Sequence, residues 1–190
     1  KVKAKSKRIN IIEAFDGQLY TKKITAPATI KNNEVLSDIN RDILKIVVYN
    51  RYKKSAPAVS FIKGFGLKKV SIASTIAHDS HNIISIGVND EDIVNAINRL
   101  IELKGGILIT ENGKYEEIKL SIGGLLTFEN GKKIAKDYRN LNRRVKSMGS
   151  QLNAPFMTMS FMALLVIPEL KLSDKGLFDA QNFRFTDLFQ

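Results

Sequence analysis

The 190-residue chain has no cysteine and no tryptophan, and it contains only two histidines and four prolines. Without cysteine it has no disulfide, no thiol nucleophile and no thiolate ligand for a metal. The zinc deaminases whose ligands include a Pro-Cys-x-x-Cys pair are therefore excluded. The absence of cysteine fits a reducing compartment, and we expect a cytoplasmic protein.

Long hydrophobic runs are absent as well. The longest stretch without a charged side chain is 147–168, and its apolar part, 156–167, has 12 residues. A helix needs about 20 apolar residues to cross a bilayer. The first residues are charged, and no apolar segment of the signal-peptide type follows them. We expect a soluble protein without a membrane partner.

Negative charge is scarce in the first third of the sequence. The formal net charge is +11, from 30 Lys and Arg against 19 Asp and Glu. Residues 1–69 carry 16 basic and 5 acidic side chains, whereas residues 70–190 carry 14 of each. A basic excess can indicate a nucleic-acid partner. Because this excess is dispersed, we interpret it as solvated surface and expect no nucleic acid.

Residues 1–30 differ in pattern from the rest of the chain. Two β-rich runs, 10–15 and 18–24, flank Asp16-Gly17, which is typical of a β-hairpin turn. The polar stretch 31–40 then predicts a linker. Residues 1–30 are therefore expected to belong to another layer or domain than residues 42–190.

The remainder alternates between strand and helix patterns. We expect two helices. The first is capped by Asn89 or Asp90 and ended by Gly105-Gly106, with an apolar stripe of Ile93, Ala96, Ile97, Leu100 and Ile101. The second spans 131–148, with a core-facing seam of Ile134, Tyr138, Leu141, Val145 and Met148. A buried helix is expected over 156–167. The predicted strands and turn lie at 43–49, 58–62, 70–77, 83–88, 107–110, 115–120 and 174–176. The fold class predicted is α+β, a mixed but mostly antiparallel sheet with about three packed helices.

Both histidines lie in one pentapeptide, His78-Asp79-Ser80-His81-Asn82, between two predicted strands. Histidine and aspartate can ligate a divalent metal or exchange protons near neutral pH. Asp79, Ser80 and Asn82 are also residues that form turns through their own side chains. From the residues alone, the loop is either a self-bonded turn or a metal or proton-transfer site.

A second short motif is Lys63-Gly64-Phe65-Gly66, the opening of an RNA-recognition strand signature. The signature then requires aromatic residues where this sequence has Leu67 and Val70. We expect instead that the two glycines permit a bulge or a close backbone approach beside the histidine pentapeptide. No phosphate-binding loop, dinucleotide fingerprint or nucleophile elbow is present, and neither H-x-H nor H-E-x-x-H occurs.

Taken together, these motifs resemble the C-terminal domain of bacterial adenine deaminase. The most specific block is the run from Ala77 to Asn82, A-H-D-S-H-N. The resemblance extends in order along the chain through segments 63–67, 73–82, 87–92, 98–102, 105–106, 155–158 and 166–170.

The resemblance implies an amidohydrolase-superfamily enzyme of purine salvage and adenine catabolism that hydrolyses adenine to hypoxanthine and ammonia. It implies a metal-activated water, with Mn²⁺ or Fe²⁺ as cofactor, because a metal lowers the pKa of its bound water. The ligands of that centre belong to a (β/α) barrel of about 250 residues, which this sequence lacks. We therefore expect no TIM barrel here, and an isolated chain that is inactive.

The resemblance also suggests where the residues of this chain act. Residues 1–30 would complete a small β-sandwich shared with a preceding part of the protein. The pentapeptide would face the mouth of the barrel, with His78, His81 and Asp79 as tentative metal ligands. The full set of pocket-lining candidates is His78, Asp79, Ser80, His81, Asn82, Lys63 and Phe65.

The expected partners are adenine, the missing barrel and further copies in a homo-oligomer. Two alternatives remain: a stand-alone nucleotide- or RNA-binding module, and a purely structural oligomerisation domain.

Overall fold

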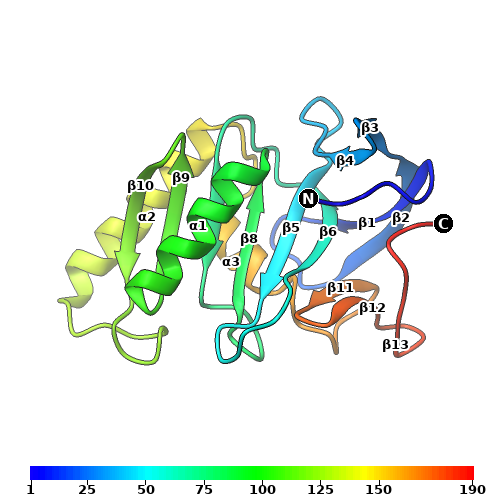
Figure 1. Cartoon of the computed structure of the whole chain (residues 1–190). Coiled ribbons are helices and arrows are strands. Elements are labelled where there is room, and N and C mark those ends of the chain that lie inside the picture. Colours follow the sequence, from blue (N-terminus) through cyan, green and yellow to red (C-terminus); the bar gives the residue numbers. More distant parts are fainter.

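The computed structural model describes all 190 residues and contains one eight-stranded sheet as its centre (Figure 1). The strand order is β10-β9-β7-β8-β5-β6-β1-β2, and every neighbouring pair is antiparallel except β1 with β6. The bounds are β1 Arg8–Ala14, β2 Thr21–Pro27, β5 Leu44–Tyr49, β6 Ala58–Lys63, β7 Ser71–Ser74, β8 Ile83–Gly87, β9 Gly106–Glu111 and β10 Lys114–Lys119.

Helices cover both faces of this sheet (Figure 1). Helix α1 (Asp90–Leu103) packs on one face, where it shares a core of 8 buried residues with the sheet. Helices α2 (Gly131–Ser147) and α3 (Pro155–Ser160) lie on the other face, over a core of 27 buried residues. The predicted α+β class is confirmed. None of the helices has the length and apolar character that a membrane span requires.

Two small sheets complete the fold. One is the hairpin of β3 (Thr29–Lys31) and β4 (Glu34–Leu36), which lies within the stretch where a linker was expected. The other contains β11 (Leu170–Ser173), β12 (Gly176–Asp179) and β13 (Arg184–Phe185). The linker prediction fails because Val35 is fully buried and anchors a short apolar cluster.

The two long helices follow their sequence patterns. Asn89 caps α1, its side-chain oxygen accepting from the Asp92 amide at 2.8 Å, and the helix ends at Lys104 in the left-handed conformation. Of the apolar stripe expected on α1, only Ile101 is largely exposed. On α2, the predicted seam faces the core: Leu141 and Val145 are buried, and Ile134, Tyr138 and Met148 pack against the same cluster.

The third helix is shorter than expected. The apolar run 156–167 predicts a helix, but α3 stops at Ser160 and the chain continues in turns. The Ser160 hydroxyl donates to the Met157 carbonyl at 2.7 Å, which satisfies a backbone acceptor near the end of the helix. Burial explains the apolar composition of the run, since Met159 and Met162 are both fully buried without forming one continuous helix.

The N-terminal hairpin is formed as predicted, with Asp16-Gly17 in the turn between β1 and β2. Strand β1 also pairs in parallel with β6, so these residues extend the main sheet. Their role in a β-sandwich shared with a preceding part of the protein stays a prediction.

Candidate functional site

The histidine pentapeptide, residues 78–82, is called the His loop below. It connects β7 to β8 at one end of the main sheet, the lower end in Figure 1. The strand register fixes this placement, because Ile83 pairs with Tyr49 at that end and Gly87 pairs with Lys45 at the other. The loops β5–β6 and β10–α2 lie at the same end as the His loop.

Hydrogen bonds with two neighbouring segments hold the backbone of the His loop. The His78 amide donates to the Ser160 carbonyl at the end of α3, at 2.9 Å. From the β5–β6 loop, Arg51 Nε donates to the His81 carbonyl at 2.7 Å, and the Tyr52 hydroxyl donates to the Ser80 carbonyl at 3.0 Å. The loop is therefore held by its surroundings, beyond the self-bonded turn that its composition suggests.

Arg51 also reaches the loop that follows β10. Its Nη2 donates to the Gly123 carbonyl at 2.6 Å, while Thr75 Oγ1 donates to the Gly124 carbonyl at 2.5 Å. A side chain at Gly124 would overlap the Arg51 guanidinium, so the glycine permits this approach. One guanidinium thus joins the His loop and the β10–α2 loop.

The two imidazole rings are close neighbours. The His78 ring stacks on Phe161, with centroids 4.9 Å apart and planes at 20°, and its centroid is 5.4 Å from that of His81. Burial lowers the pKa of His81 below its ordinary value of 6.5, and the charges of His78 and Arg51 lower it further, against a smaller opposing effect of Asp79. His81 is therefore neutral at pH 7.

The His loop does not form a complete metal site within this chain. No group of three or more His, Asp or Glu side chains is arranged to hold a metal ion, so His78, Asp79 and His81 do not converge as a ligand set. In addition, His81 Nδ1 accepts from the Ala77 amide at 3.4 Å, which occupies that lone pair. His78, His81 and Asp79 therefore do not make a metal site by themselves, and no metal step is assigned to them.

Asn82 is the most buried polar residue of the loop. Its Nδ2 donates to Ser80 Oγ at 3.1 Å, which matches the turn-forming role expected from the sequence. Its Oδ1 is buried without a hydrogen-bond partner. A buried acceptor without a donor lowers the stability by about 1–3 kcal/mol, so a donor that reached Asn82 Oδ1 would stabilise the loop.

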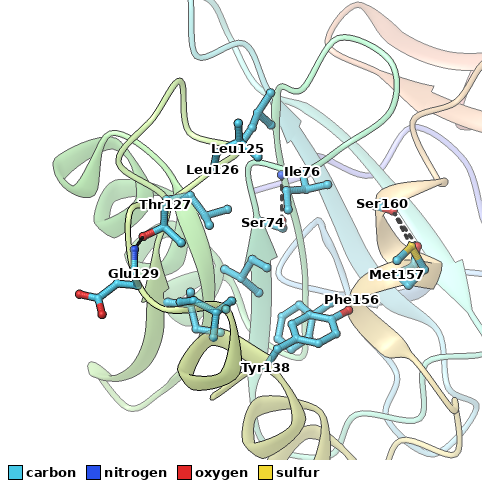
Figure 2. Close-up of a pocket in the computed structure, with 15 residues that line it drawn as sticks. Ser74, Ile76, Leu125, Leu126, Thr127, Glu129, Tyr138, Phe156, Met157 and Ser160 are labelled. Carbon is cyan, nitrogen blue, oxygen red and sulfur yellow. Dashed lines mark hydrogen bonds between the residues drawn. The ribbon is translucent and has the colours of Figure 1, made fainter. Parts of the chain in front are cut away.

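Two cavities lie near the His loop: loop residues line the first, whereas Ile76 and Ser160, which adjoin the loop, line the second. One, of about 450 Å³, is lined by Asp79 and Ser80 together with apolar side chains of residues 163–166 and of the small C-terminal sheet. The other, of about 390 Å³, lies between the sheet, α2 and α3 (Figure 2). Figure 2 shows Tyr138 beside Phe156 on its lower side, with ring centroids 6.2 Å apart, and the Glu129 carboxylate pointing away from it.

Lys63 and Phe65 do not belong to this site. The register places the end of β6 at the opposite end of the sheet, since Ile62 pairs with Leu44. Phe65 is fully buried in the large core and offers no ring to a base, and Lys63 Nζ lies 3.3 Å from Glu13 Oε1 in an ion pair. Grouping these residues with the His loop was wrong, because a linear sequence does not show which ends of strands share an edge.

The glycines of that motif do permit close backbone approach, although not beside the His loop. A side chain at Gly64 (φ +104°) would overlap the Ala14 carbonyl oxygen, and one at Gly66 (φ +66°) would lie 2.8 Å from the Gly149 oxygen. The amides of Gly64 and Gly66 donate to the Asp42 carboxylate at 2.8 and 2.7 Å. The motif therefore has a structural role, and we call it a junction because it joins the segments that contain Ala14, Asp42 and Gly149.

Sequence reasoning missed the residues that support the loop: Arg51, Tyr52, Phe161 and Lys171. Lys171 is fully buried, and its ammonium donates to the Leu19 carbonyl at 2.5 Å and the Phe161 carbonyl at 3.2 Å. Burial lowers the pKa of Lys171 to about 8. A lysine within the apolar run Leu170–Leu172 is the one sign in the sequence that could have indicated it.

Comparisons with known proteins agree with the family resemblance noted from the sequence. The family model described as the adenine deaminase C-terminal domain matches residues 18–184. An adenine deaminase of Methanosarcina barkeri is 50% identical over 96% of this chain, and those of Borreliella afzelii and Parabacteroides distasonis are 46% and 44% identical over 98% and 99% of it.

The match covers only part of these relatives. The chain spans 33–34% of the length of each of the three. A family match over most of the chain, with close relatives of one name, is nevertheless decisive for membership: this chain belongs to the adenine deaminase C-terminal domain family.

Proposed function

We propose that this chain is the C-terminal portion of a cytoplasmic adenine deaminase, which hydrolyses adenine to hypoxanthine and ammonia. The observation that carries the proposal is that relatives named adenine deaminase match 96–99% of the chain at 44–50% identity. The water-activating metal, Mn²⁺ or Fe²⁺, would be held by the preceding catalytic portion, since the residues of this chain gather no ligand set.

Within that enzyme, we assign to the His loop the task of lining or closing the adenine pocket. Asp79 and Ser80 are exposed and line a cavity, while the backbone behind them is fixed by Arg51 and Tyr52. A neutral His81, whose Nδ1 accepts from the Ala77 amide, can donate a hydrogen bond from Nε2 to a neutral purine without placing a charge against it. A polar loop on a rigid support suits the positioning of a small heterocycle.

The test is to substitute His78→Ala and His81→Ala, separately, in the full-length protein that carries this sequence. We expect kcat/KM for adenine to fall about tenfold or more, because small misplacements of substrate are costly in rate. The matched control is Lys63→Ala, at the opposite end of the sheet, which should leave kcat/KM unchanged. Unchanged turnover and metal content in both histidine variants would contradict this role of the loop.

A further inference from the structure

Large apolar side chains that are exposed to solvent lie in or beside two cavities near the His loop. Phe128 is the most extreme, with 89% of its surface exposed. Monomeric soluble proteins rarely leave such side chains grouped in one place unless another molecule covers them. The members of this apolar surface are Leu126, Phe128, Met157, Val166, Phe183 and Phe185.

The two cavities place these side chains next to the loop. Leu126 and Met157 line the 390 Å³ cavity (Figure 2), and Phe128 follows Leu126 by two residues in the β10–α2 loop. On the other side, Val166, Phe183 and Phe185 line the 450 Å³ cavity together with Asp79 and Ser80. Three members of the apolar surface therefore share a cavity with the His loop, while Leu126 and Met157 share one with Ser160, whose carbonyl accepts from the His78 amide.

Three polar side chains of the 390 Å³ cavity already make hydrogen bonds within the chain. Ser74 Oγ accepts from the Ile76 amide at 2.9 Å, Thr127 Oγ1 accepts from the Glu129 amide at 3.2 Å, and the Ser160 hydroxyl donates to a carbonyl of its own helix. Figure 2 shows Leu125, Leu126 and Ile76 on one side and the two aromatic rings on the other. The cavity thus suits apolar side chains better than a polar small molecule.

Hydrogen bonds and one ring-stacking contact connect the His loop to the segments that carry the apolar surface. Arg51 donates both to the His81 carbonyl and to the Gly123 carbonyl, three residues before Leu126. On the other flank, the His78 amide bonds to Ser160, and the His78 ring stacks on Phe161, five residues before Val166. Whatever covers the apolar surface therefore also fixes the position of the His loop.

The length of the relatives indicates the occupant. This chain accounts for about a third of each adenine deaminase that it matches, so the other two thirds form a much larger body. We propose that the apolar surface is the docking face for that catalytic portion, whose apolar side chains enter the 390 Å³ cavity, while the 450 Å³ cavity lined by Asp79 and Ser80 stays open to the active site. This inference rests on the proposed function, in which the His loop faces the active site.

The experiment is limited proteolysis of the full-length protein that carries this sequence, with the double variant Phe128→Arg/Met157→Arg. The readout is the rate at which a fragment of about the size of this chain is released. The matched control is Val94→Arg/Ile101→Arg, on the exposed side of α1, where both side chains are about half exposed. Light scattering on all variants reports the oligomeric state.

We expect release from the docking-face variant to be about tenfold faster or more, because the burial of even one large apolar side chain shifts an equilibrium by that factor. The control should release at the wild-type rate. Equal rates for the two double variants would overturn the proposal. A change of oligomeric state without faster release would also overturn it, since the surface would then bind a second copy.

The outcome for docking is separable from the outcome for catalysis. Release is measured without substrate, so faster release in the Phe128→Arg/Met157→Arg variant supports docking even if the wild-type protein does not hydrolyse adenine. In that case the docking face stands and the proposed function falls. Conversely, adenine hydrolysis that depends on His78, combined with unchanged release, removes only the docking face.

Discussion

The two ends of the main sheet carry the two short motifs of this sequence, and they are built differently. At the Gly64 end, backbone lies against backbone: Gly64 against Ala14, and Gly66 against Gly149, with the Asp42 carboxylate between the two amides. At the His-loop end, backbone also lies against backbone where Gly105 meets Gly124, but the side chains of Arg51 and Tyr52 hold a polar loop whose exposed residues line a cavity. The Gly64 end connects segments of the fold to one another, whereas the His-loop end exposes polar side chains.

The difference shows how a motif that resembles a binding signature can be purely structural. Phe65, which would stack on a base in an RNA-binding strand, is instead fully buried. The backbone of the His loop is not packed against other backbone as closely as Gly64 and Gly66 are, and the Asp79 and Ser80 side chains are exposed. We therefore expect changes at the Gly64 end to lower global stability, and changes at the His-loop end to act locally.

The largest effect is expected for Gly64→Ala. The new methyl group would overlap the Ala14 carbonyl oxygen, at a φ of +104° that a residue with a side chain rarely adopts. We expect the free energy of unfolding to fall by about 3 kcal/mol or more, measured by urea denaturation.

The control for this prediction is Gly17→Ala, in the β1–β2 turn. Gly17 also has a positive φ, +68°, but no atom lies within 4 Å of the added carbon. Its cost should be limited to the backbone, about 1–2 kcal/mol. If the two substitutions cost the same, close approach does not explain the Gly64 end.

A smaller effect is expected at Lys171, which connects the turn before β2 to Phe161 under the His loop. Because burial lowers the pKa of Lys171 from 10.5 to about 8, the unfolded chain binds more protons between these two pH values. The unfolding free energy of the wild type should therefore rise relative to Lys171→Met between pH 8 and 10.5, by on the order of 3 kcal/mol.

The pH series is measured by urea denaturation of both proteins at each pH, so that all other titrating groups cancel in the difference. Parallel stability curves for the wild type and Lys171→Met over this range would show that the buried ammonium carries no such penalty. The His-loop end would then not depend on the ionisation of Lys171.

The smallest global effect is expected for Arg51→Ala. The variant loses the bonds to the His81 and Gly123 carbonyls, both near the surface, so the unfolding free energy should fall by only about 1 kcal/mol. Hydrogen exchange of the His81 amide, which bonds to Ala77, should nevertheless become faster than that of the sheet amides. Arg139→Ala, on the exposed face of α2, serves as the control. If exchange became equally faster at the His81 amide and at the sheet amides, the expectation that changes at the His-loop end act locally would be contradicted.

Local patterns predicted most of the fold. The cap at Asn89, the seam on α2 and the Asp16-Gly17 turn are each decided by neighbours within a few residues, and all three are found in the structure. The linker over 31–40 was wrong, and the helix over 156–167 is formed only as far as Ser160, because burial of Val35 and Met162 depends on residues far away in the sequence.

The site was predicted only in part. The His loop was located as a polar loop between two strands, as the structure has it. Its supports could not be predicted, because Arg51 and Phe161 reach it from segments 30 and 83 residues away from His81 and His78. The separation of Lys63 from the loop likewise depends on strand register, which no short motif contains.

The contact of Gly66 with Gly149 has a consequence for evolution. A side chain at Gly66 would lie 2.8 Å from the Gly149 oxygen, and one at Gly149 would lie 2.5 Å from the Gly66 oxygen. Neither position can compensate for a change at the other, since both obstacles are main-chain atoms. Gly66 and Gly149, 83 residues apart in the sequence, are therefore both required for this contact. We expect relatives to retain both glycines or to lose both together with the contact.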